Sequence, residues 1–205
     1  MCIFKRTPFR WVEFVGQPEL NNHNPVQEIM KRTHFIILLI LIPFITQIRA
    51  QYTETEVKAA YLERFTRFID WPPANCIASN QFVIGVMDGD VTERVFSSLY
   101  ASQKIKERPV KIINIKSKEE FEKLCACNMV YITDKWSDEI DAIIKSMTGR
   151  PVLLVGECKK HLHCGVMINF YTDHNHLHFD LNPDLLERAG FQVDYRLLDY
   201  ASNKK

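Results

Sequence analysis

The sequence lacks the short motifs that mark several common enzyme classes. It has no Gly-x-Ser-x-Gly nucleophile elbow, no Gly-x-x-x-x-Gly-Lys phosphate loop and no Cys-x-x-Cys redox motif. The sequence therefore gives no support for a serine hydrolase of the elbow type, a P-loop nucleotide hydrolase or a thioredoxin-like oxidoreductase. Because no carboxylate pair or Ser/His/Asp set can be assigned either, we predict a protein that is not an enzyme and needs no cofactor.

The chain also lacks an excess of charge of either sign. Residues 51–205 hold 20 lysines and arginines against 22 aspartates and glutamates, a formal net charge of −2. Nothing in this balance favours a nucleic acid or an anionic membrane surface, and we expect no nucleic-acid partner. The segment has no internal repeat and no low-complexity linker, and its length suits one domain with its own core.

No apolar run is long enough to cross a bilayer comfortably, since a spanning helix needs about 20 residues. The longest run, 35–45, contains Pro43, follows Lys31 and Arg32, and precedes the small residue Ala50. This is the layout of a secretory signal peptide. We therefore interpret 1–29 as an upstream extension or a mis-called start, 30–50 as the signal peptide, and 51–205 as one exported domain that does not itself span the membrane.

Helix and strand patterns alternate along the first part of the mature chain. A capping box at Thr53 and Glu56 predicts a helix that ends before Trp71-Pro72-Pro73. Val57, Ala60, Tyr61, Phe65 and Phe68 follow at helical spacing, so that one face of this helix is apolar.

Four apolar strands are expected at 82–86, 110–115, 128–132 and 151–156. Helices are expected between them at 92–100, from Ser117 to 124, and from Ser137 to about 148, the last two capped by those serines. This alternation predicts an α/β fold with a largely parallel sheet. The pattern then changes to a β-hairpin, 166–171 and 176–181, joined by the four-residue loop 172–175 and followed by two short helices.

Five of the seven histidines lie between residues 161 and 178. Alternation along the strand 176–181 places His176, His178 and Asp180 on one face. This set could bind zinc, copper or non-haem iron, with His161, His163 and a thiolate completing the shell. The simpler interpretation is the polar face of a half-buried strand, and both interpretations stay open.

Disulfides are the default expectation for the five cysteines of an exported domain. Cys158 and Cys164 flank a short loop that a bridge would close. Cys76 and Cys127 precede two strands that are often neighbours in a doubly wound sheet, so a bridge between them is compatible with that topology, and Cys125 could replace Cys127. A redox or metal-binding role for the Cys125-x-Cys127 pair is the alternative.

Motifs along nearly the whole mature chain resemble those of the YfiR/HmsC family of exported bacterial proteins. They are KAAYLERFTRFIDWP at 58–72, FVIGVMDGD at 82–90, ERPVKI at 107–112, CNMVYI at 127–132, GVMINF at 165–170, HFDLN at 178–182 and AGFQVDYRLLDYA at 189–201. The resemblance runs from about residue 55 to residue 203, and Cys127 matches a cysteine position of the family.

The resemblance implies a Rossmann-like three-layer sandwich with a mostly parallel sheet and a C-terminal β-hairpin. It also implies a periplasmic regulator that binds and represses an inner-membrane signalling protein, either a diguanylate cyclase or a sensor kinase. Cyclic-di-GMP levels and biofilm formation would then be the output. The sequence does not set the oligomeric state, and a homodimer is compatible with it.

Two further expectations concern the binding surface. Trp136, in the loop TDKWSD, is a candidate partner contact, although a locally packed surface tryptophan explains it equally well. The alternative function is a periplasmic ligand or metal sensor that uses the histidine-rich hairpin and feeds a histidine kinase.

Overall fold

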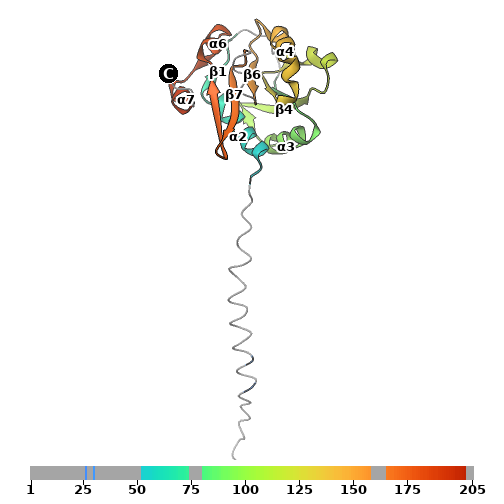
Figure 1. Ribbon diagram of the computed structural model, residues 1–205, viewed down its shortest axis with the longest axis vertical. Coiled ribbons are helices and arrows are strands. Elements are labelled where there is room, and N and C mark those ends of the chain that lie inside the picture. The colour runs from blue at the N-terminus through green and yellow to red at the C-terminus, as the bar shows by residue number, and fades with distance from the viewer. Residues whose placement is uncertain (1–25, 27–29, 31–51, 74–79, 158–164, 202–205) are drawn as a thin grey trace, which may run out of the picture. The chain divides into compact units, whose positions relative to one another are not determined.

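The computed structural model divides into two units, Met1–Gln51 and Tyr52–Lys205. It describes residues 26, 30, 52–73, 80–157 and 165–201 (Figure 1). In the first unit Val26 and Met30 are helical. The predicted signal peptide otherwise lies outside the described residues and stays a prediction. Within the described ranges, no helix is long and apolar enough to cross a membrane.

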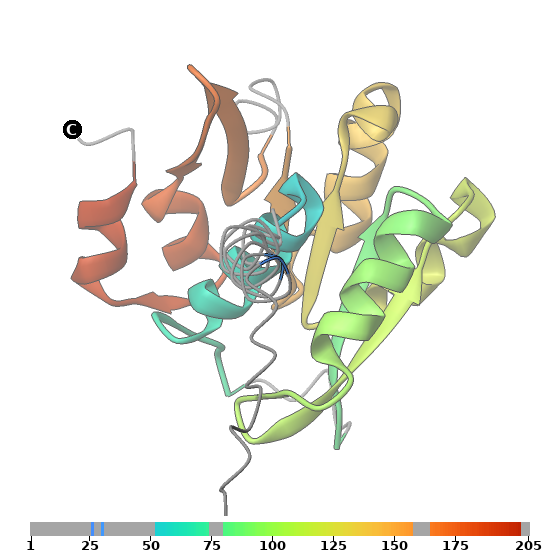
Figure 2. The same ribbon diagram turned by 90° about the horizontal axis from the view of Figure 1, so that it is seen from below.

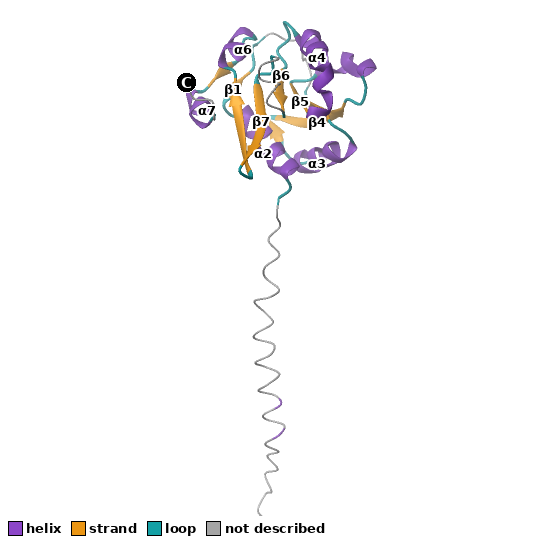
Figure 3. Ribbon diagram, viewed as in Figure 1, coloured by secondary structure: helices purple, strands orange, loops and turns teal. Residues whose placement is uncertain are grey.

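The second unit is built on a seven-stranded sheet, shown by its strands in Figure 3. Its spatial order is β3-β4-β2-β5-β6-β7-β8, in which neighbours from β4 to β7 are parallel and the edge strands β3 and β8 are antiparallel. The bounds are β2 Phe82–Met87, β3 Lys104–Ile105, β4 Arg108–Asn114, β5 Met129–Ile132, β6 Leu153–Gly156, β7 Ile168–Asp173 and β8 His176–Leu181. A small separate sheet pairs β1 Ile69–Asp70 with β9 Gln192–Val193.

Helices cover both faces of the large sheet. One face carries α2 Glu54–Thr66, α3 Asp90–Tyr100, α6 Pro183–Arg188 and α7 Tyr195–Tyr200. The other carries the 3-10 helices η1 Lys118–Ala126 and η2 Asp134–Glu139, and α4 Ile140–Met147. In Figure 2, α2 lies between α3 and the C-terminal helices α6 and α7. These three layers confirm the predicted fold class.

The central strands are continuous apolar runs because both of their faces are covered. Every residue of β2, β5 and β6 is buried. Alternate side chains enter the two cores, so that Phe82 and Ile84 pack beneath α2 and α3 while Val83 packs on the opposite side. The strands that the sequence predicted as buried on two faces therefore form the centre of the sheet.

The β7–β8 hairpin is confirmed, but its predicted four-residue loop is wrong. Thr172 pairs with Leu177 and Asp173 pairs with His176, which leaves a two-residue turn of His174 and Asn175. Both turn residues have positive φ, 47° and 62°. This combination belongs to the type I′ turn, which matches the twist of the strands and suits asparagine. β7 therefore runs two residues further than the polar loop composition suggested, whereas β8 has its predicted bounds, 176–181.

The predicted helix caps have mixed outcomes. At α2 the capping box is present, with Glu56 N donating to Thr53 Oγ1 at 3.2 Å and Thr53 N donating to Glu56 Oε2 at 2.6 Å. The box expected at Ser117 is wrong, because the carboxylate of Glu120 accepts from the backbone of Lys116 instead. Ser137 does not cap α4 either, since its hydroxyl donates to the Asp134 carbonyl inside η2.

Candidate functional site

The apolar face predicted for α2 differs from the face that the helix buries most completely. The apolar residues that the helix buries are Ala59, Leu62 and Phe65. Of the predicted face, only Phe65 is buried, whereas Ala60 is exposed and Val57, Tyr61 and Phe68 are half-buried. The helix therefore presents a second apolar face, which the core covers only in part.

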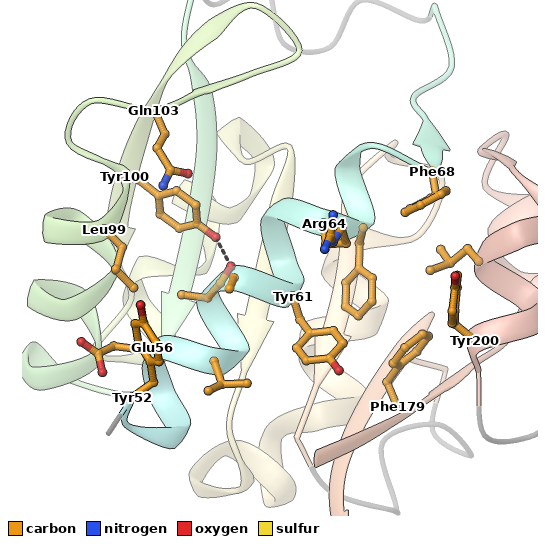
Figure 4. Close-up of a pocket in the computed structure, with 15 residues that line it drawn as sticks. Tyr52, Glu56, Tyr61, Arg64, Phe68, Leu99, Tyr100, Gln103, Phe179 and Tyr200 are labelled. Carbon is orange, nitrogen blue, oxygen red and sulfur yellow. Dashed lines mark hydrogen bonds between the residues drawn. The ribbon is translucent and has the colours of Figure 1, made fainter. Parts of the chain in front are cut away.

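This second face lines a groove of about 710 Å³ (Figure 4). Side chains of α2 and α3 form one part of it, and β8 and α7 contribute Phe179, Leu197 and Tyr200. Its lining is mainly apolar and includes Val57, Ala60, Tyr61, Phe68, Leu99 and Phe179. Sequence reasoning missed the groove because helical spacing shows that a face is apolar but not what covers it.

The wall of the groove is held by packed aromatic rings. The Tyr61 ring centroid lies 6.0 Å from that of Phe65, 5.9 Å from Phe170 and 6.0 Å from Phe179. Tilted and edge-to-face contacts of this kind stabilise a cluster beyond the apolar area that it buries. The groove is therefore a preformed surface whose side chains need little reordering on binding.

A buried hydrogen bond fixes α3 to α2 beside the groove. The Tyr100 hydroxyl donates to the Ala59 carbonyl at 2.5 Å, the dashed line in Figure 4. Burial raises the pKa of Tyr100, so the phenol stays protonated and keeps this donor at physiological pH. The two helices therefore keep their spacing along the groove.

Exposed aromatic side chains gather around the groove. Tyr52 and Tyr200 are 74% and 73% exposed and lie at its opposite ends in Figure 4. Two more exposed hydrophobic side chains lie on α7, those of Tyr195, which is 71% exposed, and Leu198. An apolar groove with exposed tyrosines at its rim has a composition that is typical of protein-binding surfaces.

The predicted histidine face exists on β8, but its members do not form a metal centre by themselves. His176 is exposed, and its Nδ1 lies 2.9 Å from the His174 carbonyl oxygen. The His178 ring stacks on the Tyr171 ring, with 5.5 Å between the ring centroids. Asp180 is half-buried opposite Asn169. Among the described residues, no three histidine, cysteine, aspartate or glutamate side chains group as metal ligands. His161 and His163 lie outside those residues, so metal binding stays a prediction.

Trp136 belongs to η2 and is half-buried rather than fully exposed to solvent. Its ring centroid lies 5.7 Å from that of Phe121, and it packs against the core beneath α4 and η1. It lies on the other side of the sheet from the groove. A role in partner binding stays a prediction for Trp136, whereas the groove offers the larger apolar surface.

Comparison with known proteins identifies the family of this chain and agrees with its fold. A family model described as YfiR/HmsC-like matches residues 55–202, which is most of the chain. The chain belongs to the YfiR/HmsC-like family. Members of this family are periplasmic regulators of membrane signalling and are not known as enzymes. No curated protein matches this YfiR/HmsC-like chain.

Among solved structures, two at 8% sequence identity resemble this chain, and the first of them shares its fold. A conserved domain protein from Vibrio cholerae has a TM-score of 0.54, with 74% of this chain and 60% of that one covered. A structure titled as the ABC domain in complex with L-Trp, from Streptococcus pneumoniae, has a TM-score of 0.49, with 68% and 59% covered. The YfiR/HmsC-like chain thus spans about 60% of the length of the structures it matches.

The cysteines of this YfiR/HmsC-like domain fall into two groups. Cys125 and Cys127 are free thiols in the structure, and Cys127 is fully buried behind β2 and β5. Burial raises the pKa of Cys127 to about 12, so this thiol is neutral at physiological pH. Cys76, Cys158 and Cys164 lie outside the described residues, and the proposed bridges stay predictions. The structure does place β2 beside β5, as the Cys76–Cys127 argument assumed.

Proposed function

We propose that this chain is a periplasmic, non-enzymatic regulator that binds and represses an inner-membrane signalling protein, such as a diguanylate cyclase. We propose further that the groove along α2 receives an apolar segment of the periplasmic part of that receiver. The observation that carries this proposal is the apolar, ring-walled groove of about 710 Å³ with exposed tyrosines at its ends. The family's role in membrane signalling supports the choice of receiver.

Repression by binding requires unequal affinity for the two states of the receiver. A ligand that binds both states equally shifts nothing, and moving an equilibrium from 99:1 to 1:99 needs a preference of about 10⁴-fold. A preformed groove suits this role because it accepts one geometry of the bound segment and excludes others. The receiver segment would fit the groove in its inactive arrangement, and sequestration would hold it there.

The test is a cross-linked pull-down from native membranes with the exported protein as bait, followed by mass spectrometry. We expect enrichment of a diguanylate cyclase or a sensor kinase. Recovery of no membrane signalling protein, at native pH and redox state, would remove the proposal.

The groove itself is tested by Ala60→Arg. Ala60 is an exposed residue in the interior of α2 that lines the groove, so the substitution leaves the core intact. Burying an unpaired guanidinium against apolar side chains costs several kcal/mol, so we expect receiver binding to weaken at least about tenfold. The measurement is affinity for the recovered receiver by surface plasmon resonance.

Ala142→Arg is the matched control for this change. Ala142 is also an exposed alanine within a helix, but it lies on α4, on the other face of the sheet. We expect it to bind the receiver as the unmodified protein does. Equal losses from the two variants would show that added positive charge, and not the groove, controls binding.

A further inference from the structure

A second and polar crevice lies at the carboxyl edge of the parallel strands. It has a volume of about 290 Å³ and is separate from the apolar groove in the residues that line it. Its lining includes Asp88 after β2, Lys135 after β5 and Glu157 after β6, together with Glu54 and Lys58 from the start of α2. Side chains from four segments far apart in sequence therefore converge there.

The topology of the sheet explains why a crevice forms at this place. After β2 the chain enters α3, which packs on one face of the sheet. After the neighbouring strand β5 it enters η2 and α4, which pack on the other face. Helices that leave adjacent parallel strands toward opposite faces open a gap at the carboxyl edge, and open α/β sheets bind their ligands in such gaps.

One half of the crevice is a fixed ion cluster around Lys58. This side chain is 6% exposed, and its Nζ lies 2.6 Å from Glu54 Oε1 and 2.7 Å from Glu157 Oε1. The Tyr131 hydroxyl also donates to Glu157, at 2.5 Å. Burial alone would lower the pKa of Lys58, but the two carboxylates outweigh it and raise the pKa. The buried ammonium therefore stays charged and in place.

The other half holds a cation that can be exchanged. Lys135 Nζ lies 2.5 Å from Asp88 Oδ1, yet the Lys135 side chain is 68% exposed while that of Asp88 is 18% exposed. Thr92 donates to the second oxygen of the same carboxylate. Because the Asp88 carboxylate is largely buried, it needs a compensating cation, and the exposed Lys135 side chain can leave it when another cation takes its place. The ammonium group of Lys135 therefore occupies a position in which another cation could bind Asp88.

Charge in the crevice favours a positively charged ligand. Four carboxylates line it, those of Glu54, Asp88, Asp134 and Glu157, against the two ammonium groups of Lys58 and Lys135. The volume is just below the range of pockets that hold drug-sized ligands, which starts at about 300 Å³. We propose that this crevice binds a small organic amine, of the size of a short diamine, whose ammonium group replaces Lys135 on Asp88. This site does not depend on the receiver or on the groove.

The test is calorimetric titration of the exported protein with 1,4-diaminobutane as the probe. We expect saturable binding of one molecule per chain, weakened by added salt because the contact is ionic. The uncharged analogue 1,4-butanediol has similar length and should give no saturable heat. Absence of saturable binding for the diamine, or equal binding of the diol, would overturn the proposal.

Two variants should shift the diamine affinity in opposite directions. Asp88→Asn removes the accepting charge and should weaken binding about tenfold or more, as expected for hydrogen bonds to charged groups. Lys135→Ala removes the internal competitor for the largely buried Asp88 carboxylate and should tighten binding at least about two- to fivefold.

Lys145→Ala is the matched control, since Lys145 is an exposed lysine in the last turn of α4 and lines neither cavity. It changes the net charge as Lys135→Ala does and should leave the affinity unchanged. If Lys135→Ala and Lys145→Ala tighten binding equally, the effect belongs to overall charge and the site is not the crevice.

Discussion

Replacing Phe65 with alanine is expected to lower the free energy of unfolding by about 3–5 kcal/mol, as truncation of a fully buried phenylalanine usually does. The Phe65 side chain has no exposed surface. Its ring centroid lies 5.6 Å from Phe170 and 4.9 Å from Phe179, so it joins α2 to the β7–β8 hairpin. Denaturant unfolding followed by circular dichroism measures the loss.

Tyr52→Ala is the control for Phe65→Ala. It also removes an aromatic ring, but from a position that is 74% exposed at the end of the groove. Surface substitutions of this kind usually change stability by less than about 0.5 kcal/mol. A loss below about 1 kcal/mol for Phe65→Ala would contradict the packed ring cluster beneath the groove.

Gly85→Val is expected to cost about 3 kcal/mol, the upper part of the usual range for overpacking a filled core. Gly85 lies in the middle of β2, and a Cβ there would come within 3.0 Å of Cys127 Sγ and 3.4 Å of Val130 Cγ2. Valine adds two further methyl groups to that crowded position. Chemical denaturation under reducing conditions, which keep Cys127 as a thiol, measures the change.

The identity of the clashing atom can be tested by combining Gly85→Val with Cys127→Ala. Removing the sulfur opens space at the point of closest contact, so the double variant should lose less stability than the two single losses added together. Residues in direct contact show coupling energies of about 0.5–3 kcal/mol, and we expect a value within that range. Additive losses would show that Val130 or the strand backbone, rather than Cys127, resists the valine.

Much of the fold was predictable because the relevant signals are local. The capping box of Thr53 and Glu56 and the apolar runs of β2, β5 and β6 depend on neighbouring residues, and the structure confirms them. The two-residue strands β1, β3 and β9 were missed because segments so short carry no periodic pattern. The hairpin loop was mispredicted because the polar residues Thr172 and Asp173 belong to β7.

The candidate site was less predictable because it depends on which elements cover which faces. The apolar residues of α2 were visible in the sequence, but the helix is apolar on more than one side. Only tertiary packing shows that Phe65 enters the core while Tyr61 borders a groove. The polar crevice was equally hidden, since Lys58 and Glu157 are 99 residues apart and meet only through the sheet order.

The ladder between β6 and β7 contains two residue pairs, Val155 with Ile168 and Gly156 with Asn169, whereas β7 and β8 share six. The hairpin is thus joined to the rest of the sheet by a short ladder, and its buried side chains, including the rings of Phe170 and Phe179 against Phe65, pack into the core beneath α2. A tilt of the hairpin would therefore be transmitted to α2 through side-chain contacts more than through the ladder. Movement of β7 and β8 would then change the width of the groove.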